Sequence, residues 1–223
     1  MKLILASASP RRAEILRNAG FEFDTRAMLV DESLRAAEPP GAYVCRLAVE
    51  KARAAAAAQV HASDSDSDGA SDRLLIGADT AVVVDGEIFG KPESDEDARR
   101  MLRRLSGRAH EVHTGLALLR EPGGVESVGE EITRVVVAPM SDEEIDRYVE
   151  TGEPFGKAGA YAIQGAGGRY IERIEGCYFN VVGFPLARFW ACLSEFGWRS
   201  ELHTAEQKRP SIGAEKTRRN AGL

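Results

Sequence analysis

Leu74–Val84 reads LLIGADTAVVV, an apolar run that predicts a β-strand with one acidic residue inside it. The run continues through Asp85-Gly86, a dipeptide typical of tight hairpin turns, into a second short apolar run at Glu87–Phe89. A carboxylate within a buried strand is costly unless it is paired or bound to a metal. Asp79 and its neighbour Thr80 are therefore candidate functional residues, although a strand-end aspartate can also make purely structural hydrogen bonds.

Apolar runs and helical patterns alternate along the chain, which predicts an α/β or α+β fold. Further strands are expected at Leu3–Ala6, Val112–Leu119, Ile132–Val137, Arg169–Ile174 and Tyr178–Val182, and the segment Phe21–Val30 has an extended character. Helices are expected at segments with apolar periodicity, several of them opened by an N-cap or a capping box: after Ser9-Pro10, at Gly41–Val60, from Ser94 to Leu105, after Ser141 and at Pro185–Phe196.

The length of 223 residues suits one large domain or two small lobes, and we expect a single domain over residues 1–200. A low-complexity acidic insertion at 62–72 interrupts it and contains no residue that would form a core. Residues 201–223 are a basic tail without apolar periodicity, which we expect to be disordered.

The composition excludes several classes of protein. Apolar residues make up 43% and charged residues 29%, as in soluble globular proteins, and no apolar run is long enough to span a membrane. The net charge of −6 disfavours general binding of nucleic acid, because such binding needs many Lys and Arg contacts to phosphates. The three cysteines are widely spaced, without a disulfide framework or a zinc motif, and we expect a cytoplasmic protein.

Three motif-like segments do not fit the sites that they suggest. Asp64-x-Asp66-x-Asp68-Gly69 opens like a calcium-binding loop, but its twelfth position is Leu75 rather than a bidentate Glu. Gly86–Lys91 and Gly152–Lys157 are each one residue short of a P-loop and lack the Ser or Thr that follows its lysine. Gly165–Gly168 lacks the full glycine pattern of a dinucleotide-binding turn.

A stronger feature is Ser7-Ala8-Ser9-Pro10-Arg11-Arg12, which lies where a predicted strand runs into a helix N-terminus. Backbone N–H groups and the positive end of the helix dipole make such a turn a favourable anion site. The two hydroxyls can donate to phosphoryl oxygens, and the two arginines add charge and paired donors. The alternative is an N-capped helix with solvated arginines.

The remaining candidates are polar residues elsewhere in the chain. Lys51 and Lys91 complete a clamp for a polyphosphate or are ordinary surface charges. Asp31-Glu32 offers hard oxygen ligands suited to Mg²⁺ or Mn²⁺, or forms a solvated acidic loop. Lys157–Gly165 combines small residues that permit close approach of backbone with Gln164, whose amide pairs well with a nucleobase edge; an ordinary glycine-rich loop is the alternative.

Together these segments resemble the Maf family, whose motifs appear here in the family's order from Leu3 to Phe196. The motifs are Ser7-Ala8-Ser9-Pro10-Arg11-Arg12, Gly77-Ala78-Asp79-Thr80, Gly90-Lys91-Pro92, Leu105-Ser106-Gly107 with His113-Thr114-Gly115, and Lys157-Ala158-Gly159-Ala160-Tyr161-Ala162-Ile163-Gln164-Gly165. The resemblance implies an α/β fold of the Maf or ITPase-like kind, with a mixed twisted sheet, flanking helices and two lobes around a deep cleft. It also implies a nucleoside triphosphate pyrophosphatase. The segment from Ala160 to Gly165 is similar to the branch that acts on dTTP and UTP.

The resemblance implies a role for each candidate residue. Asp79 would be the proton acceptor that activates water. The positions that match the family's specificity residues are Arg11, Thr80 and Gln164. The triphosphate would be held by Ser7, Arg12, Lys51 and Lys91. A divalent cation, Mg²⁺ or Mn²⁺, would be held by Glu32 and Asp79.

The expected reaction is metal-assisted attack of water on the α-phosphate of dTTP, UTP or a modified pyrimidine nucleotide, which releases the monophosphate and pyrophosphate. Two alternatives stay open: a non-catalytic nucleotide-binding regulator of cell division, and a pyrophosphatase of the branch that acts on 7-methyl-GTP. The expected partner is the small-molecule nucleotide, with no membrane and no nucleic acid, and a homodimer is expected from the resemblance alone.

Overall fold

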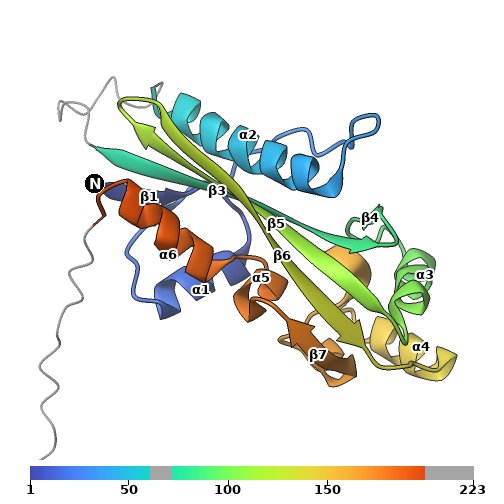
Figure 1. Cartoon of the computed structure of the whole chain (residues 1–223). Helices are drawn as coiled ribbons and strands as arrows, with labels where there is room; N and C mark the ends of the chain where they lie inside the picture. Colours follow the sequence, from blue (N-terminus) through green and yellow to red (C-terminus); the bar gives the residue numbers. More distant parts are fainter. Residues whose placement is uncertain (61–71, 199–223) are drawn as a thin grey trace, which may run out of the picture.

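The computed structural model describes residues 1–60 and 72–198 of the chain (Figure 1). Its strands are β1 (Lys2–Leu5), β2 (Asp24–Thr25), β3 (Arg73–Val84), β4 (Glu87–Phe89), β5 (Ala109–Glu121), β6 (Val125–Val137) and β7 (Ile171–Glu175). In this part of the chain they form one seven-stranded mixed sheet in the order β2-β1-β3-β5-β6-β7, with β4 paired to β3. The predicted α/β fold is therefore confirmed.

The strand β3 joins the parallel and antiparallel parts of the sheet. It pairs in parallel with β1 and antiparallel with β5, so that Asp79 lies opposite Gly115. Successive side chains of a strand point to opposite faces, so the side chains of Asp79 and Thr80 lie on opposite faces of the sheet. The predicted hairpin from β3 to β4 is confirmed, and Asp85 and Gly86 at its turn have φ of 50° and 80°.

The helices are α1 (Pro10–Asn18), α2 (Pro40–Val60), α3 (Asp95–Leu105), α4 (Asp142–Glu150), α5 (Tyr178–Val182) and α6 (Leu186–Glu195), with 3-10 segments η1 (Ala158–Ala160) and η2 (Ala166–Tyr170). The predicted helix starts are confirmed at α3, where Ser94 Oγ accepts from the N–H of Asp97, and at α4, which has a full capping box between Ser141 and Glu144. At α1 the N-cap residue is Ser9, as predicted, but its side chain makes no capping bond.

The helices cover the two faces of the sheet unequally (Figure 1). The long helix α2 lies alone on one face, where Ala48, Ala52 and Ala55 pack on β1, β3 and β5. On the opposite face one apolar cluster joins α1 and α6 to the sheet, and a second joins α3 and α4 to the far ends of β3, β5 and β6. These two clusters are the cores of the two lobes that the resemblance implied.

The helix α2 contacts the sheet through main-chain atoms. A Cβ atom added at Gly77 of β3 would lie 1.9 Å from the carbonyl oxygen of Ala48, and one at Gly115 of β5 would lie 2.2 Å from that of Val44. Real Cβ atoms do not approach other atoms so closely, so only glycine fits at these two positions. The helix therefore lies directly above the strand that carries Asp79.

The structure corrects the predicted strand at Tyr178–Val182, which is the short helix α5. The residues there favour strands, but the local conformation is decided by Asn180. Its buried side-chain amide donates to the carbonyl oxygens of Val112 and Glu131 and to Thr133 Oγ1. One helical turn aims this side chain into the sheet, and the tertiary hydrogen bonds outweigh the local preference.

Other predicted boundaries also move. The strand expected at 112–119 is the inner part of the longer β5, and that expected at 132–137 is the C-terminal half of β6. The strand expected at 169–174 begins only at Ile171, after η2. Within the extended segment 21–30 only Asp24 and Thr25 form a strand. The predicted tail at 201–223 and nearly all of the predicted insertion at 62–72 lie outside the described residues. None of the described helices combines the length and apolar character needed to cross a bilayer.

Candidate active site

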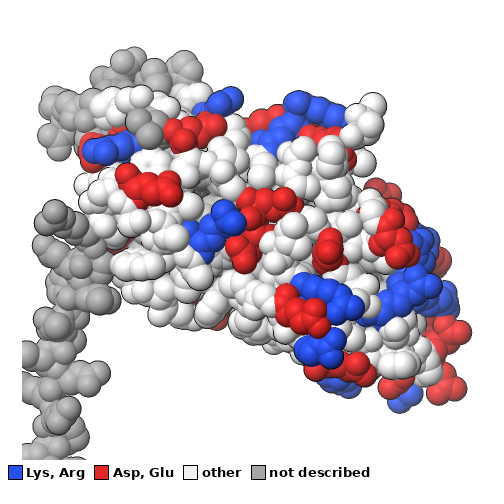
Figure 2. All heavy atoms as spheres, in the orientation of Figure 1, with Lys and Arg blue, Asp and Glu red and all other residues white. Residues whose placement is uncertain are grey.

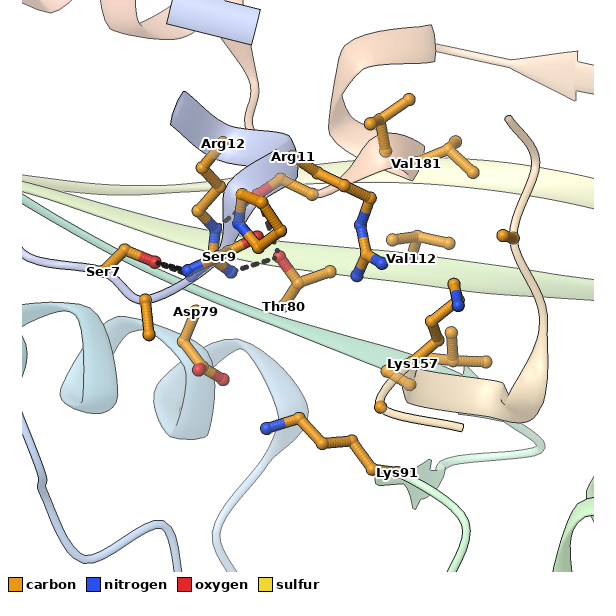
Figure 3. Close-up of a pocket in the computed structure, with 18 of the residues that line it drawn as sticks. Ser7, Ser9, Arg11, Arg12, Asp79, Thr80, Lys91, Val112, Lys157 and Val181 are labelled. Atoms are coloured by element: carbon orange, nitrogen blue, oxygen red, sulfur yellow. Dashed lines mark hydrogen bonds between the residues drawn. The ribbon is translucent and has the colours of Figure 1, made fainter. Parts of the chain in front are cut away.

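A cleft of about 660 Å³ opens between the two lobes, and every residue to which the resemblance assigned a role lines it. Its walls come from the β1–α1 turn, the middle of β3, the helix α2, the loop around Val30 and the segment from Gly156 to Gln164 (Figure 3). The lining residues include Ser7, Arg11, Arg12, Glu32, Lys51, Asp79, Thr80, Lys91 and Gln164.

The β1–α1 turn is held in place by Arg12, whose guanidinium is buried (Figure 3). Its Nε donates to the carbonyl oxygen of Gly183 at 2.8 Å, and its Nη1 donates to Ser7 Oγ at 3.1 Å and to the carbonyl oxygen of Ala78 at 2.9 Å. Its Nη2 donates to Thr80 Oγ1 at 3.0 Å. These bonds use four of the five N–H donors of a guanidinium, so Arg12 offers a ligand its charge and one further N–H.

Burial shapes the electrostatics of this group. Desolvation lowers the pKa of Arg12 from its ordinary value, whereas the nearby charge of Asp79 acts in the opposite direction. An arginine stays protonated under these conditions, so the buried positive charge persists. The turn therefore presents a fixed cation at the floor of the cleft.

Thr80 connects this turn to the neighbouring strand. Its Oγ1 lies 2.9 Å from Thr114 Oγ1 on β5 and donates to the carbonyl oxygen of Gly183 at 3.3 Å. The position that the resemblance assigns to specificity is thus one member of a hydrogen-bonded group with Arg12. Thr80 stays partly accessible at the cleft, while Thr114 is fully buried.

On the other face of β3 a lysine joins two carboxylates. Lys51 Nζ, from α2, donates to Asp79 Oδ1 at 2.6 Å and to Glu32 Oε1 at 2.7 Å. The side chains of Lys51 and Asp79 are 9% and 12% exposed, whereas that of Glu32 is 47% exposed. Lys91 Nζ lies 3.8 Å from Glu32 Oε2, and Figure 3 shows this lysine pointing toward Asp79.

Glu32 is a stable carboxylate in this arrangement. Desolvation by itself would raise its pKa, but the hydrogen bond and charge of Lys51, together with the charge of Lys91, bring the net pKa below the ordinary value. Its neighbour Asp31, which was considered with it as a ligand, instead accepts from the N–H of Ser33 in an exposed turn.

The donor set suits a divalent cation only in part. Glu32 and Asp79 already share one cation, so their oxygens lie close enough to bind a single positive charge. No group of three or more His, Cys, Asp or Glu side chains in the described residues could hold a metal. Mg²⁺ is commonly bound by one or two carboxylates completed by substrate phosphates and water. The two carboxylates fit that pattern, because a phosphate in the cleft would supply the missing oxygens.

The wall of the cleft opposite the β1–α1 turn includes the segment from Gly156 to Gln164. Gln164 is exposed there and lines the cleft, while Tyr161 is buried and its hydroxyl lies 2.8 Å from His110 Nε2. From outside the cleft, Tyr148 accepts from the N–H of Ala162 within this segment, and Glu153 accepts from the N–H of Ala166 just after it.

Sequence reasoning overlooked Lys157 as a cation of the site. Its segment was singled out for its small residues and for Gln164, and its Gly-Lys pair was correctly rejected as a P-loop. Figure 3 shows the Lys157 side chain reaching the same part of the cleft as Arg11. Desolvation, helped by the charge of Arg11, lowers the pKa of Lys157, against the opposing influence of Glu153. The available sequence signal was a lysine that follows a glycine and precedes a run of small residues.

Comparison with known proteins gives the relatives of this chain. The chain is 47% identical over 196 residues to the dTTP/UTP pyrophosphatase of Moorella thermoacetica, covering 88% of this chain and 95% of that protein. It is 49% identical over 197 residues to the dTTP/UTP pyrophosphatase of Symbiobacterium thermophilum, with the same coverage. The solved structure of the Staphylococcus aureus Ham1 protein matches only distantly, with a TM-score of 0.41 and 15% identity over 62% of this chain and 72% of that one.

The family model for Maf-like protein matches residues 2–196 and thus contains the whole cleft. Its span runs from the strand that leads into the Ser-Arg turn to the end of the last described helix. With this match and relatives close to half identical over most of its length, the chain belongs to the Maf-like protein family.

Proposed function

We propose that the protein is a nucleoside triphosphate pyrophosphatase that hydrolyses dTTP and UTP to the monophosphate and pyrophosphate. The observation that carries the proposal is a nearly buried carboxylate, Asp79, placed among the cations of a cleft large enough for a nucleotide. The relatives that bear the name dTTP/UTP pyrophosphatase support the choice of substrate. The catalytic domain would span residues 1–200.

The triphosphate is proposed to lie against Ser7, Lys51 and Lys91. Phosphoryl oxygens accept strong charge-assisted hydrogen bonds from such groups, and the buried Arg12 adds a fixed positive charge below them. Lys157 brings a further ammonium group from the opposite wall. Catalysis of phosphoryl transfer is mostly positioning and charge stabilisation, which these cations supply.

Asp79 is proposed to accept the proton of the attacking water. Its carboxylate points toward Lys91 in Figure 3 and lines the same cleft as the β1–α1 turn. Glu32 and Asp79 would hold Mg²⁺ or Mn²⁺, which supplies charge neutralisation on the phosphates when bound.

Gln164, with Arg11 and Thr80, is proposed to select the base. Uracil and thymine present two carbonyl acceptors that flank one N–H donor, and a carboxamide can donate to one carbonyl while it accepts from the ring N3–H. Cytosine has an amino group and an unprotonated ring nitrogen at the corresponding places. A site arranged for uracil would leave polar groups unpaired with cytosine, at about 1–3 kcal/mol for each lost pair.

The cellular setting is also a proposal. The three cysteines are free thiols, which suits a reducing cytoplasm. On the face shown in Figure 2, basic and acidic side chains intermix over α3, α4 and β7, as in the pairs Arg103–Asp142 and Arg134–Glu175. A mixed surface of this kind favours a small-molecule substrate over nucleic acid. A homodimer stays a prediction.

The decisive experiment is a pyrophosphate-release assay with Mg²⁺ or Mn²⁺ and a panel of UTP, dTTP, CTP, ATP and 7-methyl-GTP. We expect release from UTP and dTTP, and for Asp79→Asn a fall in turnover of roughly 10²-fold or more with UTP binding retained. Binding of UTP without pyrophosphate release by the wild type would instead favour a regulatory binding protein, and a preference for 7-methyl-GTP would favour the other branch. Near-normal turnover in Asp79→Asn would exclude Asp79 as the base.

A further inference from the structure

Glu153 lies in the turn that follows α4, outside the cleft, yet its side chain holds the segment that carries Gln164. Its Oε2 accepts from the N–H of Ala166 at 2.8 Å, and its Oε1 accepts from the N–H of Gly167 at 3.0 Å. Hydrogen bonds from backbone N–H to a carboxylate are charge-assisted and roughly twice as strong as neutral ones. This acidic residue therefore fixes the chain immediately after Gln164.

Tyr148, on α4, extends the same anchor to the other side of Gln164. Its hydroxyl donates to Glu153 Oε1 at 2.7 Å and accepts from the N–H of Ala162 at 3.1 Å. The backbone N–H groups of residues 162, 166 and 167 thus all donate to the side chains of Tyr148 and Glu153, which lie in and just after α4. Backbone N–H groups in a loop need such partners, so the loop and its anchor form one unit.

The side chains of Glu153 and Tyr148 also pack closely against the glycines of this loop. A Cβ atom at Gly165 would lie 2.3 Å from Glu153 Oε2, and one at Gly167 would lie 2.5 Å from the Tyr148 hydroxyl. Desolvation would raise the pKa of Glu153, but the hydrogen bonds from Gly167, Tyr148 and Ala166 hold it below the ordinary value. The anchor is therefore a carboxylate bound to the backbone just after Gly165, together with a tyrosine hydroxyl bound to the backbone before it.

We propose that Glu153, supported by Tyr148, is a positioning residue that sets base selectivity by holding Gln164 at the distance and angle needed to pair with a pyrimidine. The proposal rests on the proposed function of Gln164. Selective pairing depends on alignment, and a displacement of about 1 Å can cost a large part of the effect of a correctly placed group. Glu153 touches neither base nor phosphate and acts through the loop alone.

The test compares Glu153→Gln and Tyr148→Phe with Glu150→Gln, an exposed carboxylate at the end of the same helix. The readouts are kcat/KM for UTP and CTP, the dissociation constants of both nucleotides measured without divalent ions, and the urea midpoint of each variant. Glu153→Gln replaces one acceptor oxygen with an N–H donor that faces another N–H. We expect the UTP-to-CTP preference to fall about tenfold in both anchor variants and to stay unchanged in the control.

A double-mutant cycle with Gln164→Ala shows whether Glu153 acts through Gln164. In the Gln164→Ala background, Glu153→Gln should cause no further loss of preference. A purely structural role would lower the fraction of folded protein and reduce UTP and CTP activity equally, and an unchanged preference with either anchor variant overturns the proposal. So does a wild type that binds UTP and CTP equally. A wild type that binds UTP selectively without releasing pyrophosphate refutes the proposed activity and leaves the positioning role supported.

Discussion

Replacing Lys51 with methionine removes the ammonium group that joins Asp79 to Glu32 and keeps most of the apolar stem. The Lys51–Asp79 pair is almost fully buried, with a distance of 2.6 Å, whereas Glu32 is about half exposed. Removing one partner of a buried pair typically costs about 3–5 kcal/mol, because the other charge is left uncompensated. Both groups border an open cleft that admits water, so we expect a loss of about 3 kcal/mol, with at most about 1 kcal/mol more from the exposed Glu32 contact.

The same change should alter the response to a divalent cation. In the wild type the ammonium group already occupies the place between the two carboxylates, so Mn²⁺ should stabilise the nucleotide-free protein only slightly. In Lys51→Met, Asp79 loses this partner and Glu32 keeps only its long contact with Lys91, so Mn²⁺ at 100 times its dissociation constant should restore about 2.7 kcal/mol.

Urea unfolding at neutral pH, with and without Mn²⁺, measures both effects. The matched control is Lys91→Met, because the Lys91 side chain is 63% exposed and lies 3.8 Å from Glu32, a contact worth about 0–1 kcal/mol. If Lys51→Met unfolds at the wild-type urea concentration, or if Mn²⁺ stabilises wild type and variant equally, then Lys51 is not the counter-ion of these carboxylates.

Three further predictions concern the sheet, the cleft and a buried histidine. Gly77→Ala should cost about 1–3 kcal/mol in urea unfolding and reduce turnover, because its Cβ would lie 1.9 Å from the Ala48 carbonyl oxygen, whereas Gly90→Ala, with open space around it, should be nearly neutral. Gln164→Ala should reduce the preference for UTP over CTP by roughly tenfold while slowing UTP turnover less, which competition assays measure directly. Burial lowers the pKa of His110 from 6.5 to about 4. Between pH 4 and pH 6.5 the unfolded chain therefore binds a proton on His110 that the folded chain does not. Stability should therefore fall by up to about 3 kcal/mol as the pH drops from 6.5 to 4, and the variant His110→Gln should lack this component of the slope.

The parts of the fold that could be predicted are those with a local signal. The hairpin at Asp85-Gly86 and the helix starts at Ser94 and Ser141 each depend on a few adjacent residues, and the structure confirms them. The helix α5 could not be predicted, because the hydrogen bonds of Asn180 reach residues 47 to 68 positions away.

The same distinction applies to the site. Its candidate residues could be named from the sequence and the family resemblance, and apart from Asp31 the cleft contains the candidate ionic residues. Their mutual arrangement could not be predicted from the sequence. Lys51 lies 19 and 28 positions from the two carboxylates that it joins, and nothing local marks it as their shared partner. Arg12 looked like a free phosphate ligand, yet its Nε is bound to a carbonyl oxygen 171 positions away. Such contacts depend on how the lobes pack.

The strands β3 and β5, of 12 and 13 residues, are paired from Arg73 to Val83 and run without a break beneath both lobes. An enzyme whose halves are joined by flexible crossings can close on its substrate by rotating one half against the other, with a hinge at the crossings. Here the connection is a continuous ladder of hydrogen bonds, and a hinge would have to break it. Enclosure of a nucleotide must therefore come from the rims, such as the loop where Leu29 stands fully exposed, while the floor stays rigid.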